Sequence, residues 1–307
     1  MEPMKAVLTD ERFSDPGWIF ERKLDGIRCL AIRDGDGVQL MSRTARLMND
    51  QFPELVDALE RQPSADFIAD GEIVAFENGI TSFSRLQRRG RERVPVFLYL
   101  FDLPRHAGED LRSLPLRKRK ARLRRALEFG GPVRFNPHRN GEHGEELYRE
   151  ACEKGLEGVM AKRADSPYVS GGRSRDWLKL KCHAEQELVI GGYTAPKGSR
   201  TEFGALLVGY YDDGGTLRYA GKVGTGFDHH TLRDLGEHMR ELEQDESPFE
   251  RFKPIPPGTH WVRPELVGQI GFTEWTRDGR LRHPRFLGLR DDKAVTDVVR
   301  ERPSPSR

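Results

Sequence analysis

Short β-strand patterns bounded by Gly and Asp turns recur along the whole chain, and this feature limits the fold more than any other. The segment Asp34-Gly35-Asp36-Gly37 is one such turn, because Gly and Asp tolerate the backbone angles that tight turns require. Alternating or short continuous apolar runs flank the turns, as is typical of strands that cover a core. The segment 28–33 is expected to continue or pair with 18–22. The strands predicted in the first part of the chain are 18–22, 28–33, 38–42, 67–76, 94–101, 158–163 and 177–181.

Three segments with helical spacing of apolar residues interrupt these strands, at 53–61, 116–129 and 144–154. The second has Arg and Lys on one face and an apolar stripe on the other. Residues 1–16 have neither pattern and are expected to form an irregular arm. A mixture of strands and helices of this kind indicates the α+β class.

The pattern changes near Ala184. Strands are predicted over 188–193, 205–211, 216–223 and 268–275, and one helix over 229–242. Several short strands with a single helix fit a small Greek-key barrel of the OB type. We therefore predict two domains, 1–184 and 185–300, and a flexible tail over 301–307 that is rich in Pro and Ser.

Composition excludes several classes of protein. No apolar run is long enough to span a bilayer, and the N-terminus has no apolar signal region. A cytoplasmic location is therefore expected. The three cysteines, Cys29, Cys152 and Cys182, are odd in number and form no C-x-x-C pair, which argues for a reducing compartment and against a disulfide framework.

One region is strongly basic although the net charge of the chain is only +2. Between Arg85 and Arg125 there are fourteen Lys and Arg residues against four Asp and Glu. Such an excess suits an anionic partner such as a nucleic acid. A solvated helix face explains the same run equally well.

The most specific candidate for chemistry is Lys23, in the segment Glu21-Arg22-Lys23-Leu24-Asp25-Gly26. It follows a predicted strand, and strand alternation places it on the same face as Glu21. A lysine becomes a nucleophile when desolvation or nearby cations depress its pKa. A single K-x-D-G segment is weak evidence, because it also fits an exposed lysine at the end of a strand.

Later segments strengthen this hypothesis. Asp70 and Glu72 lie on one face of a predicted strand, and Glu157 precedes another. Lys179 and Lys181 project from one face of a third strand, where two like charges are destabilising unless an anion lies over them. A triphosphate would be such an anion.

In their order, these segments resemble the motifs of the covalent nucleotidyltransferases, which include DNA ligases, RNA ligases and mRNA capping enzymes. The chain is most similar to ATP-dependent DNA ligases, and among them to the ligase domain of bacterial non-homologous end-joining ligases. The resemblance covers nearly the whole chain and includes 81–87, 221–226 and 245–249. It implies an α+β adenylation domain with antiparallel sheets and flanking helices, followed by an OB-fold barrel.

The resemblance also implies a reaction. Lys23 would attack the α-phosphate of ATP and carry AMP, which would pass to a DNA 5′-phosphate before the 3′-hydroxyl attacks. Glu21 would lie at the adenine edge, Arg28 and Glu72 at the ribose, and Phe101 would stack on the base.

Several further residues would hold phosphates or complete the pocket. Lys179 and Lys181 would bind the α-phosphate, and Met160 fits the adenine pocket and the core equally well. The segment Arg290-Asp291-Asp292-Lys293 resembles the R-x-D-K motif of the barrel domain, so Arg290 and Lys293 would orient the leaving pyrophosphate.

Metal and DNA contacts follow from the same resemblance. Glu157 and Glu72 would hold Mg²⁺ or Mn²⁺, since Mg²⁺ takes one or two carboxylates beside phosphate oxygens and water. Arg43 would hold the DNA 5′-phosphate, although the family more often has Asn-Gly after this arginine and this chain has Thr44-Ala45. Further DNA contacts are expected from Arg85, Arg88 and Lys222.

The same motifs are compatible with other functions. RNA ligases and capping enzymes use the same lysine chemistry, and a non-catalytic DNA-binding module is the alternative from another class. A monomer acting on nicked or broken duplex DNA is expected, with the barrel closing by motion near Ala184. Because little chain precedes Lys23, we expect weak, salt-sensitive binding to nicked DNA, or help from a Ku-like end-binding protein. Separate polymerase or nuclease subunits are further candidate partners.

Overall fold

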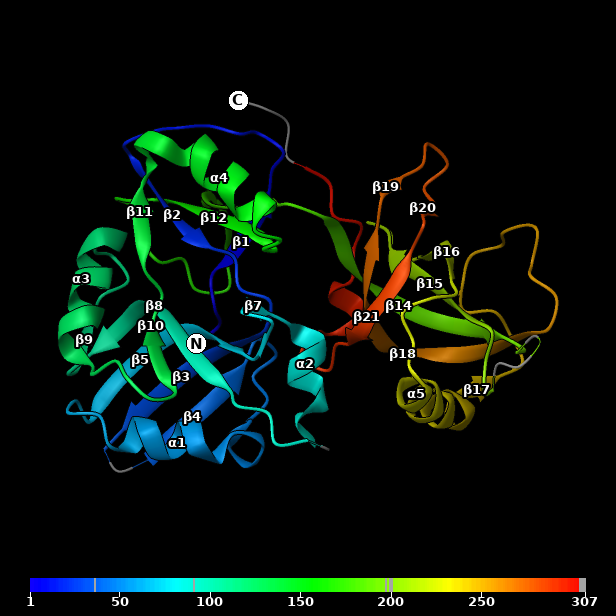
Figure 1. The fold of residues 1–307 in the computed structure, drawn as a ribbon, viewed down its shortest axis with the longest axis horizontal. Helices are drawn as coiled ribbons and strands as arrows, with labels where there is room; N and C mark the ends of the chain where they lie inside the picture. The colour runs from blue at the N-terminus through cyan, green and yellow to red at the C-terminus, as the bar shows by residue number, and fades with distance from the viewer. Residues whose placement is uncertain (36, 91, 197, 199–200, 304–307) are drawn as a thin grey trace. The chain divides into compact units, whose positions relative to one another are not determined.

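The structure is a computed structural model that describes residues 1–35, 37–90, 92–196, 198 and 201–303 (Figure 1). Its contacts divide the chain into two compact units, one over Met1–Cys182 and the other over His183–Glu301. The expected boundary at 184 lies two residues beyond this division. Of the expected tail, Glu301 belongs to the second unit and donates its N–H to Gln186 Oε1 at 2.9 Å, whereas 304–307 lie outside the described residues.

The first unit contains a five-stranded sheet in the order β1-β13-β12-β2-β11. All of its pairs are antiparallel except β1 with β13. One face is covered by α4 (Gly144–Glu153), which packs with Trp18, Phe20 and Val159. The strands are β1 (Lys5–Leu8), β2 (Trp18–Arg22), β11 (His138–Asn140), β12 (Gly158–Arg163) and β13 (Arg173–Lys181).

A second sheet of the same unit has the order β10-β8-β5-β3-β4, with β9 paired to β8. Helix α1 (Pro53–Glu60) and a large apolar core containing Leu55 and Leu98 cover its outer face. The strands are β3 (Ile27–Asp34), β4 (Gly37–Ser42), β5 (Asp66–Val74), β8 (Phe97–His106), β9 (Glu109–Asp110) and β10 (Val133–Phe135). Two shorter helices complete the unit, α2 (Phe83–Gln87) and α3 (Leu116–Ala126), beside a hairpin of β6 (Phe76–Glu77) and β7 (Ile80–Thr81).

Three expectations about this unit are wrong. Residues 1–16 are not a wholly irregular arm, because β1 pairs with β13. The segment 28–33 does not continue or pair with 18–22, because β2 and β3 belong to different sheets and the chain crosses between them at 23–26. The basic helix ends at Ala126, three residues early, and its charged face is not wholly solvated, since Arg119 and Lys120 are buried.

The expectation of no disulfide is also wrong. Cys152 of α4 and Cys182, directly after β13, form a disulfide, whereas Cys29 is a buried free cysteine. The two are 30 positions apart in the sequence, and α4 packs on the same sheet that contains β13, which brings their Cα atoms to 5.2 Å. This proximity depends on tertiary packing, so cysteine spacing alone could not reveal it.

The second unit is built on a sheet in the order β16-β15-β14-β18-β17, with β21 paired to β18. Helix α5 (His229–Glu241) begins after Asp228, whose carboxylate accepts the Thr231 N–H at 2.7 Å. Apolar clusters that include Leu188 and Val189 occupy the two faces of the sheet. Its strands are β14 (Ala184–Thr194), β15 (Ala205–Tyr211), β16 (Leu217–Val223), β17 (Glu243–Gln244), β18 (Thr259–Phe272), β19 (Glu274–Trp275), β20 (Leu281–Arg282) and β21 (Arg285–Leu289).

Within the described ranges, no helix is long and apolar enough to cross a membrane.

Candidate active site

One face of the first sheet carries a row of candidate residues. Met160 of β12 lies opposite Glu21 of β2 on one side and Lys179 of β13 on the other. Directly paired residues project from the same face of a sheet. The register therefore brings together three side chains that lie 19 to 158 positions apart in the sequence.

Lys23 belongs to the next row of this face. Its backbone N–H donates to the Gly158 carbonyl at 3.0 Å, and Gly158 is paired with Lys181. The ammonium of Lys23 forms an ion pair with Glu157 Oε1, and both side chains are mostly buried. Gly158 has a φ of 149°, and a Cβ there would lie 2.0 Å from the Leu180 carbonyl oxygen. Only glycine therefore fits at this position.

The opposite face of the same strands explains why these polar residues share one side. It is apolar and packs against α4, so a register slip of one residue would expose the core and bury the lysines. The residues of this apolar cluster are Trp18, Phe20, Ala151, Val159, Ala161, Leu178 and Leu180.

The turn that follows Lys23 is held by its Asp and Gly. Asp25 Oδ2 accepts the Phe83 N–H at 2.8 Å, and the Asp25 N–H donates to Thr81 Oγ1 at 3.2 Å. A Cβ on Gly26 would lie 2.2 Å from the Ile73 carbonyl oxygen. Asp25 and Gly26 thus suit a chain that crosses between two sheets and passes close to β5.

Glu21 is the centre of a buried ionic network. Lys120 Nζ lies 2.5 Å from its Oε1, and Lys162 Nζ lies 2.7 Å from its Oε2. Lys120 also donates to the carbonyls of Phe101 (3.1 Å) and Asn136 (3.2 Å). Burial alone would raise the pKa of Glu21, but the two ammonium groups lower it below its usual value. The residue expected at the adenine edge therefore has each carboxylate oxygen in contact with a lysine.

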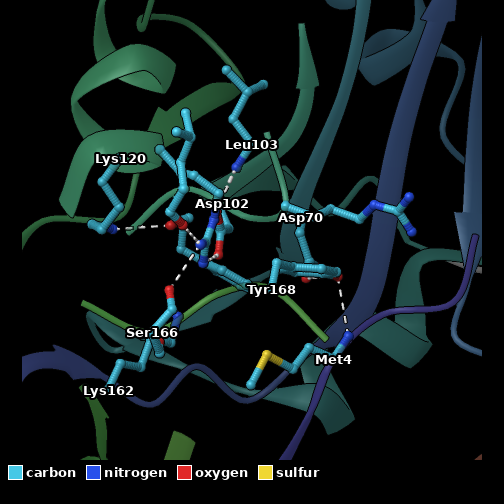
Figure 2. A network of polar contacts seen from close by, with 12 residues as sticks. Met4, Asp70, Asp102, Leu103, Lys120, Lys162, Ser166 and Tyr168 are labelled. Carbon is cyan, nitrogen blue, oxygen red and sulfur yellow. Dashed lines mark hydrogen bonds and ion pairs between the residues drawn. The ribbon is translucent and has the colours of Figure 1, made fainter. Parts of the chain in front are cut away.

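Beside this network, Asp102 of β8 holds the buried Arg119 of α3. Two hydrogen bonds join them, at 2.8 and 2.9 Å. Figure 2 shows Asp102 near Lys120, with its carboxylate also accepting the Leu103 N–H at 2.8 Å. A bidentate arginine–carboxylate pair fixes geometry as well as charge, so α3 is anchored to β8 at this point.

Arg28 and Asp70 form a second buried pair. Arg28 Nε and Nη2 donate to Asp70 at 2.6 and 2.8 Å, and Nη2 also contacts the Met4 carbonyl at 3.2 Å. Tyr168 donates its hydroxyl to Asp70 at 2.7 Å and accepts the Met4 N–H at 3.0 Å (Figure 2). Burial would lower the pKa of Arg28, but Asp70 raises it above its usual value. Arg28, expected at the ribose, is therefore held in a fixed orientation.

Phe101 lies where the two sheets face one another. Its ring packs edge to face with Trp177 of the first sheet, with centroids 6.2 Å apart. Lys162 Nζ lies 4.1 Å from the centroid of each ring, and Arg28 Cζ lies 4.7 Å from that of Phe101. These are cation–π distances. The expected stacking of Phe101 on adenine stays a prediction, as does the role of Met160.

Glu72 occupies the corresponding face of the second sheet. Its register places it between Arg28 of β3 and Tyr99 of β8. Arg28 contacts the Trp177 ring at 5.7 Å, so this face lies toward the first sheet. The structure thus places Glu72 in the same two-sheet space as the lysine face, and its expected ribose or metal contact stays a prediction.

Arg43 lies in the tight turn after β4. Ala45 adopts a φ of 59°, and its N–H donates to the Ser42 carbonyl at 3.0 Å. Left-handed backbone of this kind favours glycine. The Thr44-Ala45 sequence therefore keeps the turn that Asn-Gly would make, at a conformational cost.

The basic segment after β7 is partly neutralised by nearby acids. Arg85 forms an ion pair with Glu92, and Arg88 Nη1 lies 3.8 Å from Glu77 Oε1. These pairs are partly solvated, and such pairs contribute little to stability. A DNA contact by these arginines therefore stays a prediction.

The remaining candidates lie in the second unit. Arg290 donates to Asp292 of the same motif at 2.8 and 2.9 Å, and Lys293 Nζ lies 3.8 Å from Glu187. Lys222 of β16 is exposed. Within the R-x-D-K motif, Arg290 is therefore paired with Asp292, whereas Lys293 lies near a carboxylate outside the motif.

Sequence reasoning missed Lys120, Asp102 and Tyr168. Lys120 and Arg119 belong to the basic run between Arg85 and Arg125, and none of the motifs includes Asp102 or Tyr168. An available signal was the short apolar stripe of α3, which leaves room on its buried side for residues at 119 and 120. Their carboxylate partners could not be identified, because they lie in β2 and β8.

Comparisons with known proteins agree with this arrangement. A model of the ATP dependent DNA ligase domain matches residues 3–181, and one of the ATP dependent DNA ligase C terminal region matches 199–293. The multifunctional non-homologous end joining protein LigD of Pseudomonas aeruginosa is 42% identical over 299 residues, which is 94% of this chain and 35% of that protein. The DNA ligase of Thermococcus onnurineus is 35% identical, over 91% of this chain and 52% of that protein.

Solved structures lead to the same family. A mycobacterial DNA ligase D complexed with ATP and MES has a TM-score of 0.71 and 35% identity, and the match covers 98% of each chain. The chain spans about a third of the length of the end-joining relatives it matches. The expected fold, an α+β adenylation domain followed by an OB-fold domain, is confirmed, although two strand pairs of the first unit are parallel. On these matches, the chain belongs to the ATP-dependent DNA ligase family and contains both the ligase domain and the C-terminal region of that family.

Proposed function

We propose that this chain seals breaks in duplex DNA with ATP, through a lysyl-AMP intermediate on Lys23. The observation that supports this most directly is the position of Lys23 beside Glu157, on the sheet face that also carries Lys179 and Lys181. A polyphosphate is the kind of anion that such a group of lysine side chains binds.

In the first step, the neutral amine of Lys23 attacks the α-phosphorus of ATP. A P–N bond forms, the bond to the bridging oxygen breaks, and pyrophosphate leaves. Glu157 orients the amine, and Lys179 and Lys181 neutralise the phosphate oxygens as charge develops on them. Phe101 and Met160 would border the base. Glu21 would hold Lys162 next to the ring of Phe101.

The next two steps return Lys23 to its starting state. An oxygen of the DNA 5′-phosphate attacks the phosphorus of the adduct, and the lysine leaves. The 3′-hydroxyl then attacks the activated 5′-phosphate, losing its proton, and AMP is released. Arg43 would hold the 5′-phosphate, and Arg28 and Glu72 the ribose.

A divalent cation fits this residue set. Among the described residues there is no cluster of three or more metal-ligating side chains, whereas Mg²⁺ needs only one or two carboxylates when phosphate oxygens and water complete its shell. Glu157 and Glu72 would supply those carboxylates for Mg²⁺ or Mn²⁺. The bound ion would neutralise charge on the phosphate oxygens, and Arg290 and Lys293 would orient the pyrophosphate.

The DNA would be held by Arg85, Arg88 and Lys222 in addition to Arg43. Likeness to the end-joining ligases favours broken duplex ends in the bacterial cytosol, a Ku-like end-binding protein as partner, and polymerase or nuclease activities supplied in the same pathway. We expect the chain itself to be a monomer.

The test is formation of the covalent adduct. The protein is incubated with ATP labelled in the α-phosphate and divalent cation, and then denatured. We expect label on the protein, none on Lys23→Ala, and normal labelling of the exposed-surface control Lys154→Ala. Labelling by GTP or NAD instead of ATP, or a labelled Lys23→Ala protein, would contradict the proposal. Sealing of nicked DNA against nicked RNA then distinguishes DNA ligase from RNA ligase.

A further inference from the structure

Arg22, between Glu21 and Lys23, has an unusual environment. Its Nε and Nη2 atoms are buried, and neither has a hydrogen-bond partner among the described residues. By contrast, two fully buried cations near the site are paired. Arg119 contacts Asp102, and Lys120 contacts Glu21.

The Arg22 side chain is oriented by aromatic rings. Its Cζ lies 5.9 Å from the centroid of Phe76, which packs against Phe97 at 5.6 Å and Tyr99 at 6.2 Å. Tyr99 is the register partner of Glu72. Arg22 pairs in register with Val159, so it leaves β2 on the face opposite Lys23. Its guanidinium nevertheless lies beside Phe76, whose ring packs on Tyr99 next to Glu72 on the second sheet.

Such an arrangement is costly unless something else pairs with the cation. Burial lowers the pKa of Arg22, with an opposing effect from Tyr99, but a guanidinium stays protonated in proteins. Buried donors without acceptors destabilise a fold. Aromatic packing keeps the planar group ordered, and its geometry suits the oxygens of a phosphate.

We propose that Arg22 is a phosphate-binding residue of this site. The phosphate comes either from the polyphosphate of the nucleotide or from the DNA strand presented to Lys23, and both sources have the same chemistry. The inference deepens the proposed ligase function and rests on it.

The experiment compares Arg22→Met, which removes the charge but keeps a long apolar side chain, with Arg22→Lys, which keeps the charge but not the planar fork. Arg134→Met is the matched control, because Arg134 lies over a neighbouring ring, that of Phe97, at 5.6 Å. Each protein is measured in three ways: the shift in melting temperature caused by tripolyphosphate, the single-turnover rate of adduct formation at low ATP, and the single-turnover sealing of nicked DNA by adenylated protein.

If the nucleotide supplies the phosphate, Arg22→Met loses the tripolyphosphate shift and forms adduct at least tenfold more slowly. If DNA supplies it, the shift is retained and only the sealing step falls at least tenfold. In both cases the rate of the affected step falls at least threefold for Arg22→Lys, and both rates of Arg134→Met stay within twofold of the parent. The melting temperature of Arg22→Met is no lower than that of the parent.

The inference is overturned if both Arg22 variants stay within twofold of the parent in both steps, as they would if a buried water satisfied the guanidinium. It is also overturned if Arg22→Met has a lower melting temperature than the parent and both single-turnover rates fall only in proportion to the fraction of folded protein. A parent protein that forms no adduct would instead contradict the proposed function, so the two failures are distinguishable.

Discussion

Lys120 of α3 donates to Glu21 of β2 at 2.5 Å, across 99 positions of sequence, and each side chain is about 1% exposed. Glu21 is two residues before the proposed nucleophile. The ion pair therefore connects a helix from the most basic part of the chain to the strand that ends just before Lys23.

Lys120→Met should destabilise the first unit by about 3 kcal/mol, because removing one partner of a buried ion pair leaves the other charge uncompensated. Chemical denaturation measures the change, with exposed Lys118→Met of the same helix as control, for which we expect less than about 0.5 kcal/mol. The double variant with Glu21→Gln should cost less than the sum of the single variants. A loss below about 1 kcal/mol for Lys120→Met would show that the pair is not coupled to folding.

The pH dependence of stability should contain a contribution from His138, which is paired in register with Glu21. Burial, then Lys120, lowers the pKa of His138 below the usual 6.5. The unfolded chain therefore takes up this proton first, so the free energy of unfolding falls as the pH drops below about 6.5 toward the folded-state pKa. His138→Gln should reduce the difference in the free energy of unfolding between pH 7.5 and pH 5.5. The same substitution at the exposed His143 should leave that difference unchanged. Equal slopes in the parent and His138→Gln would refute this.

Ala45→Gly should stabilise the protein by up to about 1 kcal/mol. Ala45 has a φ of 59°, and glycine adopts left-handed backbone without the penalty that an L side chain incurs. Thermal unfolding measures the gain. Ala126→Gly, at the end of α3, is the opposite control and should cost up to about 1 kcal/mol. A lower melting temperature for Ala45→Gly would contradict the conformation of this turn.

Thiol titration of the denatured, unreduced protein should detect one free thiol, from Cys29, and three after reduction. Closing a loop of about 30 residues is worth about 3 to 4 kcal/mol in the chain-entropy model. Cys182→Ser should therefore unfold at lower denaturant than the parent under non-reducing conditions, and the difference should shrink with reductant. Three titratable thiols before reduction would exclude the disulfide.

Lys179→Met should slow adduct formation by about 100-fold or more, the usual effect of removing one group that stabilises developing charge. Its fold should persist, because the residue lies on the polar face and outside the apolar cluster against α4. Single-turnover labelling measures the rate, with Lys154→Met as the control. A rate within threefold of the parent would remove Lys179 from the proposed site.

Local sequence patterns predicted the first and last residues of several strands correctly. The strands at 18–22, 158–163 and 205–211 are found with those bounds, because alternation and Gly or Asp turns act over a few neighbouring positions. Alternation also placed Lys179 and Lys181 on one face of β13, which the register of the sheet supports. By contrast, β1 escaped prediction, since its four partly buried residues have no pattern until β13 lies beside them.

The short strands, the ordered motifs around Lys23 and the ligase family that those motifs indicate can be predicted from the sequence. Which charges are buried, and with which partners, depends on the tertiary structure. Examples are the pairs of Glu21 with Lys120, Asp70 with Arg28, and Asp102 with Arg119. Another is the guanidinium of Arg22, two of whose buried nitrogens have no hydrogen-bond partner among the described residues. The physical reason is that ion pairing and desolvation depend on distances of a few ångströms between segments far apart in the chain, and no local pattern encodes those distances.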